Sequence, residues 1–452
     1  MNKLTKFFVF TIIISPSLNA DFINKIYIEN KISELFECGF KPLDNSSYPL
    51  SKTRLFFAIE NTKILNTKDC LEKKKQILKS IKEDALSEKK IIGYQFANGE
   101  YNFNDSTSRN LLDSNYFLRY SNSSNSLEYS IEITNLEDKQ VFDNTFLRLY
   151  RGNKILSAGK IAQWWGPSEE TSLILSNQAR PFPIISFENN IPTKIQYLDF
   201  LGPVSYKIFL GKLESKREIP NTSILGMRIE LNPNESLNIG LSRTAQFGGD
   251  GRSVSLSTIK DIILGKDNQG KESPGNQLGA FDIKYSFNGN EIYGQIVGED
   301  EAGYLPSRTF YYLGFSKYLN NDYDKKISIE TLDTENKIPN YTYSHKFYRD
   351  GYRYLGIPIG ASIDADSELH SISFRNVIKK DIFIKVKYFK GKINKNNSEF
   401  NYISNSSQQL EGVSLDYQNI FNGKIFVSSR LNFFNDFVGS KSSLFIKLEY
   451  KF

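Results

Sequence analysis

The sequence predicts an all-β transmembrane protein, namely an 18-stranded antiparallel outer-membrane β-barrel with an N-terminal periplasmic three-helix bundle. Three observations support this fold class: an export leader, an unusual composition, and strands with one apolar and one charged face. The mean hydropathy is −0.41 and only 39% of residues are hydrophobic, yet the chain has 26 Tyr and 34 Phe. Low hydropathy with many aromatic residues fits an exported all-β protein or a membrane barrel.

The first twenty residues have the pattern of a signal peptide. Lys3 and Lys6 precede an apolar stretch (7–14) that is too short to span a bilayer, and Leu18-Asn19-Ala20 resembles a signal-peptidase site. We expect cleavage after Ala20, which removes two lysines and lowers the net charge from +6 to +4. Over 452 residues this is a small excess, so we expect no nucleic-acid partner.

Strand periodicity is clearest at the C-terminus, SLFIKLEYKF. Apolar side chains from Leu444 to Phe452 alternate with Ser443, Lys447, Glu449 and Lys451, and the chain ends on an aromatic residue, as in outer-membrane proteins. The same alternation recurs at 127–133, 281–287 and 382–388, which is the pattern of a barrel with lipid outside and a polar lumen inside. The alternative is a soluble β-sandwich, which would be unusually large with this many strands.

Eighteen strands are predicted, an even number, as bacterial single-chain barrels require. They lie near 90–97, 116–122, 126–134, 144–151, 154–162, 194–201, 204–213, 223–232, 236–245, 278–287, 290–299, 308–318, 325–333, 370–378, 381–391, 410–418, 424–434 and 442–452. Short turns alternate with the long segments 98–115, 163–193, 246–277, 334–369 and 392–409. Since barrels keep short turns in the periplasm, we expect the long segments to be extracellular or folded into the lumen, with outer-membrane lipid around the wall.

The predicted barrel covers 90–452, and residues 21–89 precede it as a periplasmic helical bundle that could plug the lumen. Helical spacing predicts a first helix that ends at Gly39 and a second that starts after Pro49 with Ser51 as its N-cap. The apolar positions of the three helices are, in order, Ile28, Ile32, Leu35 and Phe36; Leu55, Phe56 and Ile59; and Leu71, Leu78, Ile81 and Ala85. The basic run 73–75 is interpreted as the solvated face of the third helix.

Cys38 and Cys70 are the two cysteines of the chain. In an oxidising periplasm an isolated pair is most simply a disulfide. The alternatives are two free buried thiols or a metal pair, and His345 and His370 lie far away in the sequence. We expect no metal and no cofactor.

Four segments on the predicted outer side concentrate aromatic residues, glycines, acids and arginines. They are QWWGPSEETSLILSNQARPFP (163–183), SRTAQFGGDGR (242–252), GEDEAGYLPSR (298–308) and YRDGYRYLGIPIGASIDADSE (348–368). Together with GNQLGAFDIKYSF (275–287), and in this order along the chain, they resemble the Wzi family of outer-membrane capsule-assembly proteins. The resemblance runs from about 155 to 370. It departs from the family at Ser168 and Phe247, where the family usually has Gly and Trp.

The resemblance implies a barrel that is closed by a helical bundle and acts as a surface lectin for capsular polysaccharide. Aromatic rings offer flat faces to sugar C–H groups, and arginines bind uronate carboxylates through two hydrogen bonds. Acidic side chains accept hydrogen bonds from sugar hydroxyls. The candidate polysaccharide-binding residues are Trp164, Trp165, Arg180, Arg243, Arg252, Glu299, Asp300, Glu301, Arg308, Tyr352, Arg353, Tyr354, Asp364 and Asp366. Any of them could instead anchor a folded-in loop. We also consider a periplasmic partner that binds the helical bundle.

Two other classes of function remain open from the sequence. A channel for saccharides would need an open lumen, which the helical segment argues against. An outer-membrane hydrolase could use His345 or His370, or acid pairs such as Glu299 with Glu301 and Asp364 with Asp366, which also suit a calcium site. Neither histidine lies in a recognisable nucleophile motif, so we expect no enzyme.

Overall fold

The structure is a computed structural model. It describes residues 35, 38, 47–49, 51–61, 64–85, 88–99, 105, 111–124, 126–137, 139–255, 260, 262, 275–302, 305–319, 325–336, 341–378, 382–422, 424–436 and 439–452. The predicted leader, residues 1–20, lies outside the described residues. Neither of the two described helices has a stretch long and apolar enough to cross a membrane.

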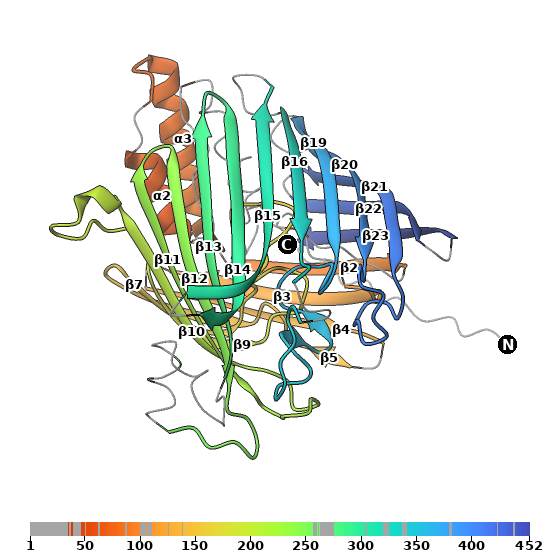
Figure 1. The fold of residues 1–452 in the computed structure, drawn as a ribbon. Coiled ribbons are helices and arrows are strands. Elements are labelled where there is room, and N and C mark those ends of the chain that lie inside the picture. The colour runs from red at the N-terminus through yellow and green to blue at the C-terminus, as the bar shows by residue number, and fades with distance from the viewer. Residues whose placement is uncertain are drawn as a thin grey trace.

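The described strands close into an antiparallel barrel, as predicted (Figure 1). Its wall has eighteen strand positions, and each position is called a stave. Each stave pairs with its neighbour in the sequence, and the first stave pairs with the last from Ile91↔Lys451 to Asn98↔Leu444. The staves are β2 (Lys89–Asn98), β3 (Asn115–Ser123), β4 (Leu127–Asn135), β5 with β6 (Gln140–Val141, Phe146–Arg151), β7 (Lys154–Lys160), β9 (Pro183–Asn189), β10 (Val204–Lys212), β11 (Ser223–Asn234), β12 (Leu237–Phe247), β13 (Gly275–Phe287), β14 (Asn290–Ala302), β15 (Leu305–Tyr318), β16 (Lys325–Asp333), β19 (Glu368–Ile378), β20 (Ile382–Ile393), β21 (Gln408–Phe421), β22 (Ile425–Asp436) and β23 (Gly439–Lys451). β5 and β6 count as one stave because both pair with β4.

The two faces of the wall follow the sequence alternation. On β2, Ile92, Tyr94 and Phe96 are exposed on the outside, whereas Lys89 and Gln95 are buried on the inside. Side chains alternate between faces in a strand, so one face of each stave supplies the apolar exterior and the other lines the lumen. The end of the barrel that holds the C-terminus carries the tight turns and is called the short-turn end; the other is the long-loop end.

One predicted strand is wrong. Residues 194–201 form an irregular turn with the 3-10 helix η1 (Asp199–Leu201), and the sixth stave is instead β9, PIISFEN. The apolar residues of 194–201 mimic a strand, but the chain leaves the sheet after Asn189, whose side-chain amide donates to the carbonyl of Ile191. Pro183 is compatible with β9 because a proline at the first position of a strand costs no ladder hydrogen bond. The long loop before this stave is therefore 161–182 rather than 163–193.

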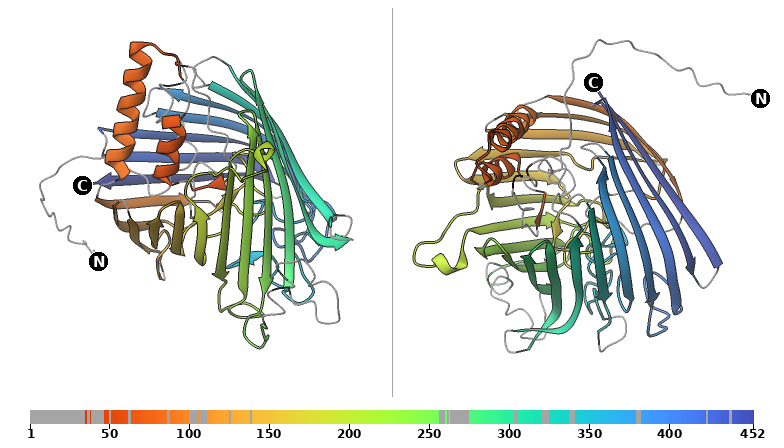
Figure 2. Two further views of the ribbon diagram at one scale, coloured as in Figure 1. Left: turned by 90° about the vertical axis from the view of Figure 1, so that its left-hand side faces the viewer. Right: turned by 90° about the horizontal axis from the view of Figure 1, so that it is seen from above.

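The N-terminal helices lie at the short-turn end (Figures 1 and 2). The described residues hold two helices, α2 (Lys52–Asn61) and α3 (Lys68–Ala85), so the predicted three-helix bundle is not supported. The first predicted helix lies outside the described residues except for Leu35, which is helical and buried, and Cys38. The predicted cap of α2 is confirmed, because the Arg54 N–H donates to Ser51 Oγ at 3.0 Å.

The buried face of α3 agrees with the predicted stripe at Leu78 and Ile81 but differs from it at Leu71. Leu71 is exposed, whereas Cys70, Ile77 and Ile81 are buried against Leu35, Leu55 and Ile59. The predicted disulfide is confirmed: Cys38 and Cys70 are bonded, with their Cα atoms 5.6 Å apart. Cys70 and Ile77 lie on the inward face of α3, whereas Leu71 lies on its exposed side.

The largest apolar core lies inside the barrel toward the long-loop end. It joins residues of loop 161–182, such as Leu173 and Ile174, to Tyr343, Tyr352 and Ile363 of segment 341–367 and to inward side chains of the wall. These two segments are called the plug. The barrel is thus filled by its own loops at this end.

Candidate functional site

The adjacent tryptophans of loop 161–182 are fully buried in the lumen. They form the two-residue strand β8 (Trp164–Trp165), which pairs with β1 (Ser47–Tyr48) through Ser47↔Trp165 and Tyr48↔Trp164. The Trp165 carbonyl accepts from the Gln295 side chain at 2.9 Å, and its ring lies 5.5 Å from that of Phe209 between centroids. These two rings therefore link the N-terminal segment to the plug and offer no face to solvent.

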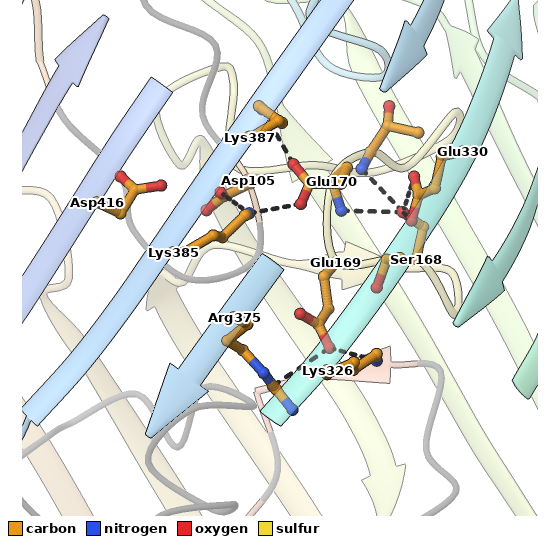
Figure 3. A network of polar contacts seen from close by, with 12 residues as sticks. Asp105, Ser168, Glu169, Glu170, Lys326, Glu330, Arg375, Lys385, Lys387 and Asp416 are labelled. Carbon is orange, nitrogen blue, oxygen red and sulfur yellow. Dashed lines mark hydrogen bonds and ion pairs between the residues drawn. The ribbon is translucent and has the colours of Figure 1, made fainter. Parts of the chain in front are cut away.

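After the tryptophans, three consecutive polar residues attach the loop to the wall (Figure 3). Ser168 Oγ is 2.8 and 2.7 Å from the two carboxylate oxygens of Glu330. Glu169 pairs with Lys326 at 2.9 Å and Arg375 at 3.4 Å; Glu170 pairs with Lys385 at 2.6 Å and Lys387 at 3.0 Å. The loop is thus held across β16, β19 and β20.

Asp105, from the segment between β2 and β3, joins the same network. Its carboxylate lies 2.8 Å from both Lys385 Nζ and Arg430 Nη2. Burial alone would raise the pKa of Asp105, but Arg430 and Lys385 outweigh it and hold this pKa far below its usual range. Asp105 is therefore a fixed anion that joins its own position in the chain to β20 and β22.

Arg180 and Arg353, both predicted to touch sugar, are used inside the protein. Arg180 makes a two-pronged contact with Asp143, with N–O distances of 2.8 and 2.9 Å. Arg353 lies on the short strand β17 (Arg353–Tyr354). Its guanidinium donates two hydrogen bonds to the Asp364 carboxylate, with N–O distances of 2.8 and 2.5 Å, and both side chains are buried. β17 pairs with β18 (Ile357–Pro358) in a hairpin of the plug.

The other candidates divide into buried and accessible residues. Tyr352, Tyr354, Asp366 and Glu299 are buried, and Glu299 accepts from the Tyr343 N–H. Arg243 is half-buried and contacts Gln277. Asp300 and Glu301 pair with β15 through their backbones, and their side chains lie outside the described part of the chain. Arg308 is exposed over the ring of Tyr341 at 4.2 Å, and Arg252 is half-buried.

Arg252 belongs to a surface that the sequence motifs do not mark as a whole. Its guanidinium lies 5.3 Å from the ring centroid of Phe347, and Lys346 Nζ approaches the same ring at 4.8 Å. Tyr402, exposed on the loop after β20, donates from its hydroxyl to the Arg349 carbonyl at 2.6 Å. Two residues before it, Phe400 is 84% exposed. We call this surface the outer patch: Arg252, Lys346, Phe347, Arg349, Phe400 and Tyr402.

A signal for the outer patch is nevertheless present in the sequence. YTYSHKFYRDGYRY (341–354) is dense in aromatic and basic residues, although the motif that resembles the family begins only at 348. Phe400 and Tyr402 lie in the otherwise largely polar stretch NNSEFNYISN. Such rings are informative in a loop because they have no place in the alternation of a strand.

These features define the class of the molecule: an outer-membrane β-barrel whose lumen is occupied by its own loops and whose long-loop end carries an aromatic and basic surface. The chain belongs to the Wzi family, since the family model "Capsule assembly protein Wzi" matches residues 74–434.

The chain is also similar to individual proteins of this kind. A protein of Klebsiella pneumoniae described as "Uncharacterized 55.8 kDa protein in cps region" is 29% identical over 296 residues, 62% of this chain. The match spans only 57% of that relative's length. The structure of Escherichia coli Wzi, described as an outer membrane protein involved in group 1 capsule assembly and a carbohydrate-binding β-barrel, aligns with a TM-score of 0.81 and 23% identity. That alignment covers 97% of this chain and 100% of that one, which shows a shared fold.

Proposed function

We propose that this protein is a lectin-like, non-enzymatic member of the capsule-assembly family that attaches capsular polysaccharide to the cell surface through the outer patch. The observation that carries the proposal is the outer patch itself, where exposed rings and cations gather at the long-loop end. Aromatic faces suit sugar C–H groups, and arginine suits the carboxylates of acidic sugars. Arg252, placed over Phe347, presents both kinds of contact together.

The plug supports a binding surface rather than a channel. Its apolar core and the polar contacts of Ser168 to Glu170 fill the barrel where a saccharide would have to pass. A rigid base also lowers the entropy cost of binding, because the contacts are in place before the polymer arrives.

Four of the residues considered for catalysis have partners within the fold, which supports a non-enzymatic function. His345 Nδ1 accepts hydrogen bonds from the backbone N–H groups of Phe347 and Tyr348. Glu299 accepts from the Tyr343 backbone and Asp364 is paired with Arg353. His370 lies on the outer wall with its Nδ1 atom 2.8 Å from Thr331 Oγ1, away from the lumen acids.

The same proposal assigns the two ends of the barrel. The short-turn end faces the periplasm and the long-loop end faces the exterior, following the usual arrangement of barrels. Residues 1–20 are a removed leader, and the described helices α2 and α3 lie at the periplasmic end. The exposed side of α3, which carries Lys75 and Lys82, then faces a periplasmic partner.

The test is to measure capsule retention in cells that carry patch variants. We expect Arg252→Ala/Phe347→Ala and Phe400→Ala each to shift polysaccharide from the cells to the medium, while barrel levels by heat-modifiable gel mobility stay normal. The matched control is Phe421→Ala/Lys424→Ala, which removes one ring and one cation at the short-turn end. Normal retention in both patch variants would contradict the proposal.

A further inference from the structure

The turn between β9 and β10 exposes aromatic side chains that no described residue covers. Tyr197 is 87% exposed and Phe200 is 72% exposed, and Ile195 and Leu198 are exposed beside them. We call residues 194–201 the foot. It projects as a separate lobe from the wall at the short-turn end (Figures 1 and 2). Soluble surfaces carry scattered apolar side chains, but four gathered on one small lobe indicate an interaction site.

The foot holds these side chains in a fixed arrangement. Backbone hydrogen bonds of 3.0 Å join Leu198 to Ile195 and Leu201 to Leu198, and Gly202 closes the turn onto Asp199. Gly202 has a φ of +66°, and a Cβ there would lie 1.7 Å from the Asn232 carbonyl oxygen, so only glycine fits. Tyr197 also has a positive φ, of 70°, which is unfavourable for a tyrosine. The local structure therefore maintains the exposure of the rings.

The foot adjoins the band of the wall that faces lipid. Ile208 and Leu210 are exposed on the outer face of β10. Tyr206 follows on the same face of β10, closer to the short-turn end. Its ring centroid lies 6.1 Å from that of Phe187 and 5.0 Å from Lys154 Nζ. Aromatic rings with a nearby lysine mark the boundary between the hydrocarbon layer and the head groups. The Thr193↔Val204 bridge then continues the hairpin directly into the foot.

We infer that the foot binds the head-group region of the inner leaflet of the outer membrane, with Tyr197 and Phe200 inserted among phospholipids. Tyr and Phe are side chains that partition into this interface, and Lys194 and Asp199 supply polar contacts at the same level. The assignment to the inner leaflet rests on the orientation given under the proposed function. The lipid contact itself does not, because it depends only on where the foot lies relative to the wall.

Tryptophan fluorescence in vesicles of brominated phosphatidylcholine tests the inference. Trp164 and Trp165, the two native tryptophans, are buried inside the barrel, so the wild-type protein supplies a background of low quenching. In Phe200→Trp we expect the added emission to lie at shorter wavelength than in water and to be largely lost when bromine sits near the head groups. Tyr197→Trp repeats the measurement at the second ring. Both leaflets carry the same lipid, so the result does not depend on orientation or on polysaccharide.

Two reference variants set the limits of the measurement. Leu210→Trp, on the lipid-facing wall, should be quenched most by bromine deep in the acyl chains. Leu65→Trp, exposed between α2 and α3, should not be quenched. If both foot variants behave like the Leu65 variant while the Leu210 variant is quenched, the lipid contact is overturned. The foot is then left for a soluble partner or a second copy of the chain.

Discussion

At the scale of single residues, Ser168 shows how the plug is attached to the wall. Its hydroxyl reaches both oxygens of Glu330 and also accepts from the N–H groups of Glu170 and Thr171, at 2.9 and 3.1 Å. This hydroxyl is thus a direct contact between the loop and a buried carboxylate of β16. Hydrogen bonds to charged groups contribute more than neutral ones.

We expect Ser168→Ala to lower the free energy of unfolding by ~1.5–3 kcal/mol, because Glu330 loses a donor and the two N–H groups lose their acceptor. The measurement is denaturant unfolding of the refolded barrel in vesicles. The matched control is Ser172→Ala, whose hydroxyl donates to the neutral Trp165 carbonyl at 2.6 Å and should cost about 1 kcal/mol. An equal loss in both variants would show that the additional contacts of Ser168, to Glu330 and to two backbone N–H groups, do not matter.

Trp165 and Arg180 show what the sequence does not reveal at this scale. A ring and a guanidinium are equally suited to a sugar surface and to a packed loop, and the sequence contains no signal for the direction of a side chain. That direction is set by partners far along the chain, namely Ser47 for Trp165 and Asp143 for Arg180. Whether either residue contacts sugar stays a prediction.

At the scale of elements, one buried carboxylate joins a residue of the connection between β2 and β3 to the wall. Asp105 is buried between Lys385 and Arg430, which keep its pKa well below the usual value. A carboxyl with a lowered folded pKa stabilises the protein fully above its unfolded pKa, about 4. This contribution declines as the pH falls below that value toward the folded pKa, so the attachment is complete at neutral pH.

Asp105→Asn is therefore expected to destabilise the protein by ~3–5 kcal/mol at pH 7, because two buried cations lose part of their neutralisation. The difference between wild type and variant should be constant from about pH 5 to 8 and shrink below about pH 4. Unfolding curves across this pH range are the check, with exposed Asp250→Asn as the control. A difference that does not change with pH would mean that the ionisation of Asp105 is irrelevant.

The elements themselves were largely predictable, for a physical reason. A stave has lipid on one side and a polar lumen on the other, so its alternation appears in the sequence without knowledge of its neighbours. The exception, 194–201, carries an apolar pattern that serves the foot instead of a stave. The plug gave no such periodicity, because its core is assembled from loops 161–182 and 341–367, which are distant in the sequence.

At the scale of the whole molecule, the orientation of the barrel in the membrane determines whether the outer patch can bind a polymer at the cell surface. The even number of staves places both ends of the barrel chain at the short-turn end, where β2 begins and β23 ends beside it. The long connections that follow β7, β12, β16 and β20 then emerge at the opposite end together with the outer patch. The proposed function requires that this end face the exterior.

Epitope tags inserted near 396 and near 289 test the direction. Residue 396 lies in the long loop after β20, and 289 lies in the tight turn between β13 and β14, so the two tags mark opposite ends of one wall. We expect antibodies to label the tag at 396 on intact cells and the tag at 289 only after permeabilisation. A tag near 268 should behave like that at 396, and one near 233 like that at 289. Because neither insertion site falls on a buried strand centre, heat-modifiable mobility should show a normal barrel for each.

Labelling of intact cells at 289 but not at 396 would place the outer patch in the periplasm, where it could not hold a surface polymer.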